Sequence, residues 1–276
     1  LFLENYKVEH PDASFHMAYN PLSDRLPEEH EAMFGYKVKP RTRREPSSSA
    51  SDSINNNTTR RGLQGFHKRD RSEDKGANEE ADDDAYPVPS EWAKELEPRQ
   101  VPTAVDWRVA KLNPDNVVAV TPVKNQAACG ACWAFTTAAA VEGAVAVTTK
   151  VLNELSNQEL IDCVRQNEGC NGGDFDYAFR FVADKGLVSS SDYKFTQSQG
   201  TCRTGQFPIA SRIKDAYMTK PCDKDRLMSI VARRPVAVAI DGSCEAFVQY
   251  RGGVYTQSCG NDLNHAVTIV GYGTEE

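Results

Sequence analysis

A strongly apolar stretch runs through residues 133–147 and contains a single charged residue, Glu142. Alanine fills much of this stretch, and five of its positions are β-branched. An apolar run with no polar face is typical of a helix that is buried on all sides. We therefore expect a central helix here, with Cys132 in its first turn.

The segment after this run carries signals for two shorter helices. Ser156 and Glu159 have the spacing of a capping box, so a short helix is expected to begin there. The second helix is indicated by apolar residues at helical spacing and by a lysine–glycine stop, at Phe175, Phe179, Val182 and Lys185-Gly186.

The pattern changes beyond residue 214. Val236–Ile240 and residues 267–270 are short, β-branched apolar runs, which predict strands. A helical half followed by a strand-rich half indicates an α+β fold. Between Trp107 and Thr121, residues 113–116 have the composition of a turn.

Composition and charge narrow the function classes. The net charge of −7 and the pI near 5.4 argue against nucleic-acid binding. All eight cysteines lie at or after Cys129, which suggests an oxidising compartment and a secretory route. No apolar stretch reaches the roughly 18 residues of a membrane helix. No signal peptide is visible, and because the chain starts at Leu1 without a methionine, we expect it to be truncated there.

The start of the predicted helix is the candidate reactive site. Unpaired backbone N–H groups at a helix N-terminus favour negative charge, so a thiol at Cys132 is expected to ionise more easily, and the thiolate is the nucleophile. The alternative is a buried structural cysteine or half of a disulfide. The sequence Cys-Gly-Ala-Cys-Trp at residues 129–133 fits the papain and cathepsin cysteine pattern. His265 follows Cys132 by 133 residues, within that family's range of roughly 130–150.

Further motifs extend this match. The chain resembles papain-family (cathepsin L-like) cysteine peptidases, densely over residues 101–276 and loosely over residues 1–36. The matching motifs are VDWR at 105–108, TPVKNQ at 121–126, LSNQEL at 155–160, GCNGG at 169–173, YRGGVY at 250–255, LNHAV at 263–267 and GYG at 271–273.

The resemblance implies a domain organisation. Residues 1–100 correspond to an inhibitory propeptide, and the peptidase domain begins near residues 97–101. Within the propeptide, residues 39–85 contain few apolar residues and are expected to be a disordered insertion. The peptidase domain, 101–276, is expected to have a helical left part and a β-barrel-like right part, with Cys132 and His265 on opposite walls of the cleft between them.

The resemblance also implies a mechanism. Cys132 supplies the thiolate, and His265 acts as imidazolium and then as proton donor. Gln126 completes the oxyanion hole together with the backbone N–H of Cys132. The asparagine that orients the histidine in the family is expected beyond Glu276, so the C-terminal part of the right domain is expected to be absent and the fragment incomplete for activity.

Substrate contacts follow in the same way. Gly172 and Gly173 let an extended substrate pair with the backbone like a strand, or they form a flexible turn. The side chains that the resemblance places around the second and third residues before the cut are Asp174, Phe175, Ala239, Leu263, Asn264 and Ala266. Asp174 is expected at the rim, favouring Lys or Arg in one pocket, unless it is simply solvated. Phe175 has the alternative of a helix core residue.

The disulfides come from the resemblance and from counting. By resemblance Cys129 pairs with Cys170, and Cys163 with Cys202. The family partner of Cys259 would lie after Glu276, which leaves Cys222–Cys244 as the residual pair. A zinc cluster is disfavoured because Cys-x-x-Cys occurs only once, and no metal or cofactor is expected.

The leading hypothesis is the proenzyme of a cysteine endopeptidase that acts on proteins or peptides through an acyl-enzyme. Its propeptide would be an intramolecular inhibitor, the molecule a monomer, and its location the lysosome, the vacuole or the outside of the cell. Two alternatives remain. A catalytically silent binding protein is disfavoured because the Cys, His and Gln are retained. A cathepsin B-like exopeptidase uses extra histidines, and this domain has only His265.

Overall fold

The computed structural model describes residues 15–17, 33–38, 101–218 and 224–274. The expected disordered insertion at 39–85 and most of the expected propeptide lie outside these ranges. The helices are α4 (Cys132–Thr149), α5 (Asn157–Cys163), α6 (Phe175–Lys185), α7 (Lys224–Val231) and α8 (Glu245–Val248), with 3-10 turns η1 (Ala110–Leu112) and η2 (Gly169–Asn171). The strands are β1 (Phe15–Met17), β2 (Val105–Asp106), β3 (Leu187–Val188), β4 (Ile209–Ser211), β5 (Val236–Ile240), β6 (Tyr250–Gly253), β7 (His265–Ile269) and β8 (Gly271–Tyr272).

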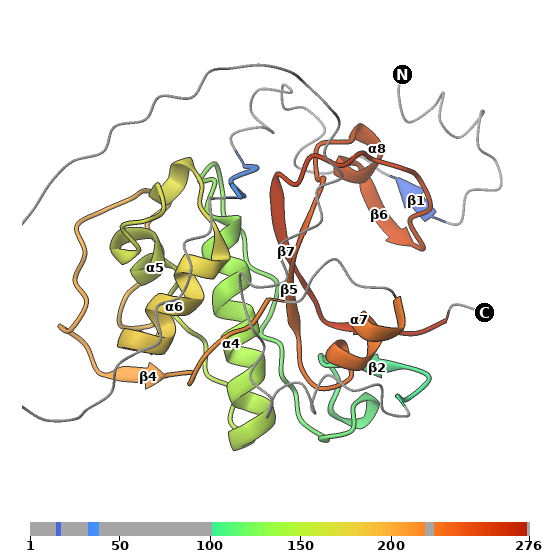
Figure 1. The fold of residues 1–276 in the computed structure, drawn as a ribbon, viewed down its shortest axis with the longest axis horizontal. Coiled ribbons are helices and arrows are strands. Elements are labelled where there is room, and N and C mark those ends of the chain that lie inside the picture. The colour runs from blue at the N-terminus through green and yellow to red at the C-terminus, as the bar shows by residue number, and fades with distance from the viewer. Residues whose placement is uncertain (1–14, 18–32, 39–100, 219–223, 275–276) are drawn as a thin grey trace, which may run out of the picture. The chain divides into compact units, whose positions relative to one another are not determined.

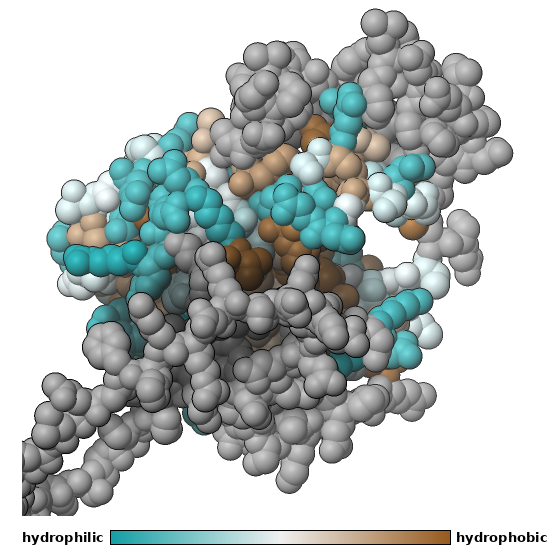
Figure 2. Space-filling model, turned by 45° about the horizontal axis from the view of Figure 1, so that its top comes forward, coloured by the Kyte–Doolittle hydropathy of each residue, from teal (hydrophilic) through white to brown (hydrophobic). Residues whose placement is uncertain are grey.

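Helices α4, α5 and α6 gather on one side of the molecule, and the later strands lie on the other (Figure 1). The α+β expectation is therefore confirmed. Seen from the side shown in Figure 2, hydrophobic residues concentrate toward the middle of the surface and hydrophilic residues cover its flanks. Within the described ranges, no helix has the length and apolar character needed to cross a membrane.

Helix α4 is the predicted central helix. Trp133, Thr136 and Ala138 are almost fully buried although they point in different directions, as expected for a helix without a polar face. The helix ends at Lys150, which adopts the left-handed conformation at φ 62° and donates its N–H to the carbonyl of Ala146.

The single charge of α4 is buried and fully bonded. Glu142 is 1% exposed and accepts hydrogen bonds at 2.8 Å from Thr121 Oγ1, Lys124 Nζ and the N–H of Leu155. A buried carboxylate is tolerated when charge and hydrogen bonds compensate its desolvation. The residue therefore ties the loop before α4 and the loop after it to the middle of the helix.

The two shorter helices begin as predicted. At α5, Ser156 Oγ accepts the N–H of Glu159 at 3.0 Å. The reciprocal half of the capping box is missing, because the Glu159 carboxylate accepts from the N–H of Val188 at 2.9 Å instead. Helix α6 ends at Gly186, whose φ of 78° suits glycine. The core between α4, α5 and α6 is built from buried side chains that include Leu155, Leu160, Ile161, Ala178 and Val182.

The strand part is organised around β5 and β7. They pair antiparallel from Val236 opposite Ile269 to Ile240 opposite His265, and β7 packs against α4. The strand predicted at 267–270 is therefore present, and it begins two residues earlier, at His265. Strand β2 pairs antiparallel with β8, and β1 pairs antiparallel with β6.

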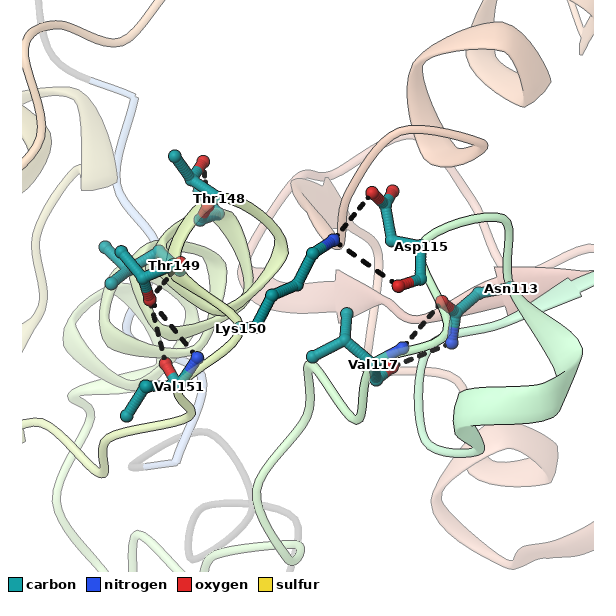
Figure 3. A network of polar contacts seen from close by, with 9 residues as sticks. Asn113, Asp115, Val117, Thr148, Thr149, Lys150 and Val151 are labelled. Carbon is teal, nitrogen blue, oxygen red and sulfur yellow. Dashed lines mark hydrogen bonds and ion pairs between the residues drawn. The ribbon is translucent and has the colours of Figure 1, made fainter.

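The loop between Trp107 and Thr121 is closed by the side chain of Asn113, whose bonds to Val117 are drawn in Figure 3. The Asn113 amide donates to the carbonyls of Asp106, Val109 and Val117, and its oxygen accepts the N–H of Val117. The predicted turn at 113–116 is present, with Asn116 at φ 49°. Asp115 pairs with Lys150 at 2.9 Å, which fastens the loop to the end of α4. A hollow of about 660 Å³ lies between this loop and the β2–β8 pair, and none of its lining residues belongs to the site described below.

Three disulfides are present among the described residues. Two join Cys129 to Cys170 and Cys163 to Cys202, the pairs expected from the resemblance. The third joins Cys244 to Cys259, so the expected Cys222–Cys244 pair is wrong. The chain leaves Cys244 through α8 and returns through β6, which brings the two Cα atoms within 5.2 Å. A count of the unassigned cysteines could not predict that the chain folds back from Cys244 to Cys259. Cys222 lies outside the described residues.

Candidate active site

Cys132 is the first residue of α4 and the only free cysteine in the part of the chain that the structure describes. It is 1% exposed. The residues before it are fixed by the Cys129–Cys170 disulfide and by the N–H of Gly130, which donates to the carbonyl of Cys170 at 2.8 Å. The thiol therefore has a rigid position at the N-terminus of a buried helix.

His265 is the first residue of β7, and its neighbour Ala266 packs directly against Cys132. The backbone N–H of Ala266 faces the Cys132 sulfur. The packing of β7 against α4 therefore brings together two residues that are far apart in sequence. The imidazole lies edge-on to the Phe34 ring, with centroids 5.5 Å apart. Its Nδ1 atom is buried and has no hydrogen-bond partner within the described ranges.

Burial shifts the pKa of each candidate group toward its uncharged form. Burial raises the pKa of the Cys132 thiol, against the opposing effect of the backbone amides of Ala266 and Gly35. Burial also lowers the pKa of His265. The expectation of an easily ionised thiol is thus wrong for this state, because desolvation outweighs the amides at the helix start.

Gln126 lies beside the same helix start. Its Nε2 atom donates to the carbonyl of Cys129 at 3.0 Å and to the carbonyl of Met33 at 2.8 Å. The second acceptor belongs to the N-terminal region of the chain. The amide of Gln126 is therefore already occupied by a backbone carbonyl oxygen.

Residues 33–38 form an extended segment over Cys132, which we call the covering segment. The N–H of Tyr36 donates to the carbonyl of Asn264, and the N–H of Lys37 donates to the carbonyl of Gly173, both at 3.0 Å. Gly173 returns a bond of 2.7 Å from its own N–H to the carbonyl of Gly35. The backbone pairing of Tyr36 with Gly173 is parallel. Figure 1 draws the covering segment in blue between α4 and β7.

Tyr36 fills an apolar cluster at the site. Its ring stacks on Phe175 with centroids 4.9 Å apart and an interplanar angle of 22°. Cys132 and Ala266 complete the buried part of this cluster, which we call the Tyr36 cluster. Ala239, from β5, packs against it and lies opposite Ala266 in the strand pair.

Two glycines permit this close approach. A Cβ atom on Gly172, whose φ is 116°, would lie 2.8 Å from the carbonyl oxygen of Gly35. A Cβ atom on Gly173 would lie 2.5 Å from the Asn167 side chain. A larger residue at Gly172 would therefore push the backbone away from the covering segment, and one at Gly173 would displace the Asn167 side chain.

The remaining predicted contact residues have different positions. Asn264 presents its carbonyl to the covering segment and fixes its own side chain by accepting the N–H of Gly242 at 2.9 Å. Leu263 is 46% exposed. Asp174 is only 2% exposed, and its carboxylate caps α6 by accepting the N–H of Asp176 at 2.9 Å. The prediction of a charged pocket rim at Asp174 is therefore wrong, because the helix start uses that carboxylate.

Several residues of the site were not predicted. They are Met33, Phe34, Gly35, Tyr36, Lys37, Glu168 and Met218. The apolar group at 33–36 stands between charged and polar residues, and this isolation is the signal that could have marked it. Among the described residues, no group of three or more His, Cys, Asp or Glu side chains is arranged to hold a metal ion.

Comparisons with known proteins agree with this geometry. The family model of the papain family cysteine proteases matches residues 101–276. Vignain from Vigna mungo is 44% identical over 177 residues, which are 63% of this chain and 47% of that protein. The chain thus spans about half the length of the curated relatives it matches.

Two solved precursors have a similar fold. The recombinant stem bromelain precursor matches with a TM-score of 0.71 and 27% identity, over 100% of this chain and 72% of that one. The digestive procathepsin L 3 of Tenebrio molitor larval midgut matches with a TM-score of 0.70 and 29% identity, over 98% and 72%. On the family match over residues 101–276, the chain belongs to the papain family of cysteine proteases.

Proposed function

We propose that this chain is part of the proenzyme of a cysteine endopeptidase, held latent by its own N-terminal region. The observation that carries the proposal is the position of the covering segment. It lies extended over the one free thiol among the described residues and bonds to Gly173 and Asn264 as a peptide strand. A site that binds its own chain in this way is suited to bind other peptides in the same place.

The proposed reaction uses Cys132 and His265 as a pair. The thiolate sulfur attacks the carbonyl carbon of the peptide bond, and the carbon–nitrogen bond then breaks. His265 gives its proton to the leaving amine, which leaves an acyl-enzyme on Cys132. Water, deprotonated by His265, then hydrolyses the thioester and restores the free thiol.

Gln126 is proposed to stabilise the oxyanion. Its Nε2 atom already donates to the Met33 carbonyl at 2.8 Å, so it can donate to an oxygen placed there. The backbone N–H of Cys132, at the open end of the helix, would be the second donor. In the latent state the Met33 carbonyl takes the place of that oxygen.

The covering segment is proposed to resist cleavage through its direction. From Gly35 beside Cys132, the chain runs through the Tyr36 cluster to Lys37. If the Tyr36 cluster receives the second residue before the cut, a substrate must run the opposite way. The backbone of the covering segment therefore runs opposite to that of a substrate, and the burial of Cys132 and His265 shifts the pKa of each group toward its uncharged form.

We assign residues 1–100 as the propeptide and residues 101–276 as peptidase domain. Protein or peptide substrates, a monomeric state and a location in the secretory pathway, in a lysosome or vacuole or outside the cell, complete the proposal. The disulfides within the described residues support an oxidising compartment.

The test uses the full-length protein before and after acid treatment. A thiol-directed epoxide should label the treated form rapidly at Cys132, and the treated form should cleave a reporter peptide. Cys132→Ala should abolish both, whereas Cys244→Ser should leave a labelled Cys132. Unchanged cleavage by Cys132→Ala would refute the proposal.

A further inference from the structure

The Gln126 amide is carried by a stretch of chain with little apolar anchoring. Residues 121–128, which we call the Gln126 segment, all belong to the described part of the chain, and none of their side chains is buried. Val123 is fully exposed. Because burial of apolar side chains does not fix this segment, its position depends on polar contacts.

Two side chains of the Gln126 segment are bonded to the body of the domain through one carboxylate. Thr121 Oγ1 donates to Glu142 Oε2, and Lys124 Nζ donates to Glu142 Oε1, each at 2.8 Å. Gln126 follows Lys124 by two residues, a length of chain that spans at most about 7 Å. A displacement of Lys124 is therefore passed on to the Gln126 amide.

Glu142 is itself rigidly held. It is 1% exposed, and its Oε1 also accepts the N–H of Leu155 at 2.8 Å. A carboxylate can accept all three of these bonds, whereas a glutamine amide cannot, because its nitrogen only donates. Glu142 follows Cys132 by 10 residues on α4, which is about 15 Å along the helix. One helix thus carries both the nucleophile and the anchor of the Gln126 segment.

We propose that Glu142 is a positioning residue for the oxyanion donor. It fixes the Gln126 segment to α4, so that Nε2 of Gln126 keeps a constant position relative to the sulfur of Cys132. The proposal rests on the proposed function, in which Gln126 donates to the oxyanion. Glu142 lies too far along the helix to touch the reacting atoms, and it acts through the placement of Gln126. Preorganised donors matter because a misplacement of about 1 Å can cost on the order of a hundredfold in rate.

The first test is Glu142→Gln in the acid-treated full-length protein. With a reporter peptide, kcat should fall by about tenfold, because a displaced donor costs less than the loss of about 10²–10³ seen when such a donor is removed. KM should stay within about twofold, since the oxyanion exists only in the transition state. Titration of the reactive thiol gives the concentration of folded enzyme in each sample.

A double-mutant cycle separates positioning from general damage. Gln126→Ala removes the donor, so adding Glu142→Gln to it should lower kcat by less than about twofold more. A tenfold loss in both backgrounds would overturn the proposal, because the effect of Glu142 would then not pass through Gln126.

A thiol probe tests whether the charge of Glu142 acts on Cys132 directly. Methyl methanethiosulfonate reacts with a thiolate by thiol–disulfide exchange and forms no oxyanion. The rate of its reaction at Cys132, and the pH dependence of that rate, should be the same in Glu142→Gln and wild type. A shifted pH profile would overturn the positioning role and assign the loss of kcat to the thiol.

Two further variants guard against effects of folding. Glu159→Gln removes another buried carboxylate, which is 2% exposed and bonds to the N–H of Val188, and it should keep the wild-type kcat. The double variant Lys124→Met/Glu142→Met replaces the buried ion pair by apolar side chains, a change that is often neutral for stability. It should show the same loss of kcat as Glu142→Gln, even if the single variant does not fold.

The outcomes separate the two proposals. Wild-type kcat in the folded Glu142→Gln variant or in the double variant would overturn the role of Glu142 and leave the peptidase proposal standing. Absence of both hydrolysis and Cys132 labelling in the complete wild-type protein would overturn the peptidase proposal itself.

Discussion

Gly35 is the residue at which the covering segment comes nearest to the start of α4. A Cβ atom there would overlap the carbonyl of Gly130, whose own N–H is bonded to Cys170. Because the Gly130 backbone is held by its bond to Cys170, the overlap can be relieved only if the covering segment moves away from α4. The proposed latency thus depends on a residue without a side chain.

We expect Gly35→Ala to expose Cys132 in the unprocessed protein. Overpacking of this kind destabilises by about 1–3 kcal/mol, so epoxide labelling at neutral pH should be faster by about tenfold. The control is Gly252→Ala, because a Cβ at that position meets open space. Equal labelling rates in the two variants would contradict the contact at Gly35.

His265 gives the covered state a pH dependence. Burial lowers its pKa below the ordinary value of 6.5, so the covered state binds fewer protons than the uncovered one. The resulting stabilisation is fully present above about pH 6.5 and is lost as the pH falls from there through the lowered pKa. Acid should therefore favour release of the covering segment.

This linkage is best measured in Cys132→Ala, where no thiolate can pair with the imidazole and no self-cleavage occurs. Hydrogen exchange at the N–H groups of Tyr36 and Lys37, corrected for intrinsic rates, should lose protection by up to about tenfold per pH unit in this window. Adding His265→Gln should flatten the curve. A curve that keeps its slope would assign the pH dependence to carboxylates alone.

At the scale of elements, Asp174 belongs to α6 and not to a binding pocket. We expect Asp174→Ala to lower the free energy of unfolding by about 0.5–2 kcal/mol, the usual effect of losing an N-cap. Denaturant unfolding measures this, with Asp192→Ala, an exposed aspartate, as the control. The substrate profile of Asp174→Asn should match wild type; a lost preference for Lys or Arg would restore the original prediction.

The elements that could be predicted from sequence are those with a local cause. The apolar run of α4, the Ser156 cap of α5 and the glycine stop of α6 each act within a few residues, and each element begins or ends where its signal lies. The Glu159 side chain departs from its local pattern because the distant N–H of Val188 competes for it.

The parts that could not be predicted depend on contacts between distant segments. Cys132 and His265 were found through spacing and resemblance, and packing of α4 on β7 places Ala266, the neighbour of His265, against Cys132. Nothing in the sequence near Tyr36 or Glu168 indicates the partner of either. The Cys244–Cys259 pair was missed for the same reason, because a count of cysteines does not tell which of them lie close together in the fold.

At the scale of the whole molecule, the start of the processed enzyme is constrained by β2. Val105 and Asp106 pair with β8, Trp107 is fully buried, and Tyr272 Oη donates to the carbonyl of Pro102 at 2.9 Å. Cleavage after acid treatment should therefore fall near residues 99–101, before these contacts. N-terminal sequencing checks this, and a start beyond Asp106 would contradict it.

The backbone bonds of the covering segment reach two parts of the domain at once. Tyr36 is bonded to Asn264, which precedes β7, and Lys37 to Gly173, which precedes α6. In calorimetric terms, the segment couples the melting of the helical part to that of the strand part. The unprocessed form should unfold in one transition whose calorimetric and van't Hoff enthalpies agree. Once the segment is removed, the same domain should unfold with weaker cooperativity. The proposed activation would therefore open the site and lower the cooperativity of thermal unfolding.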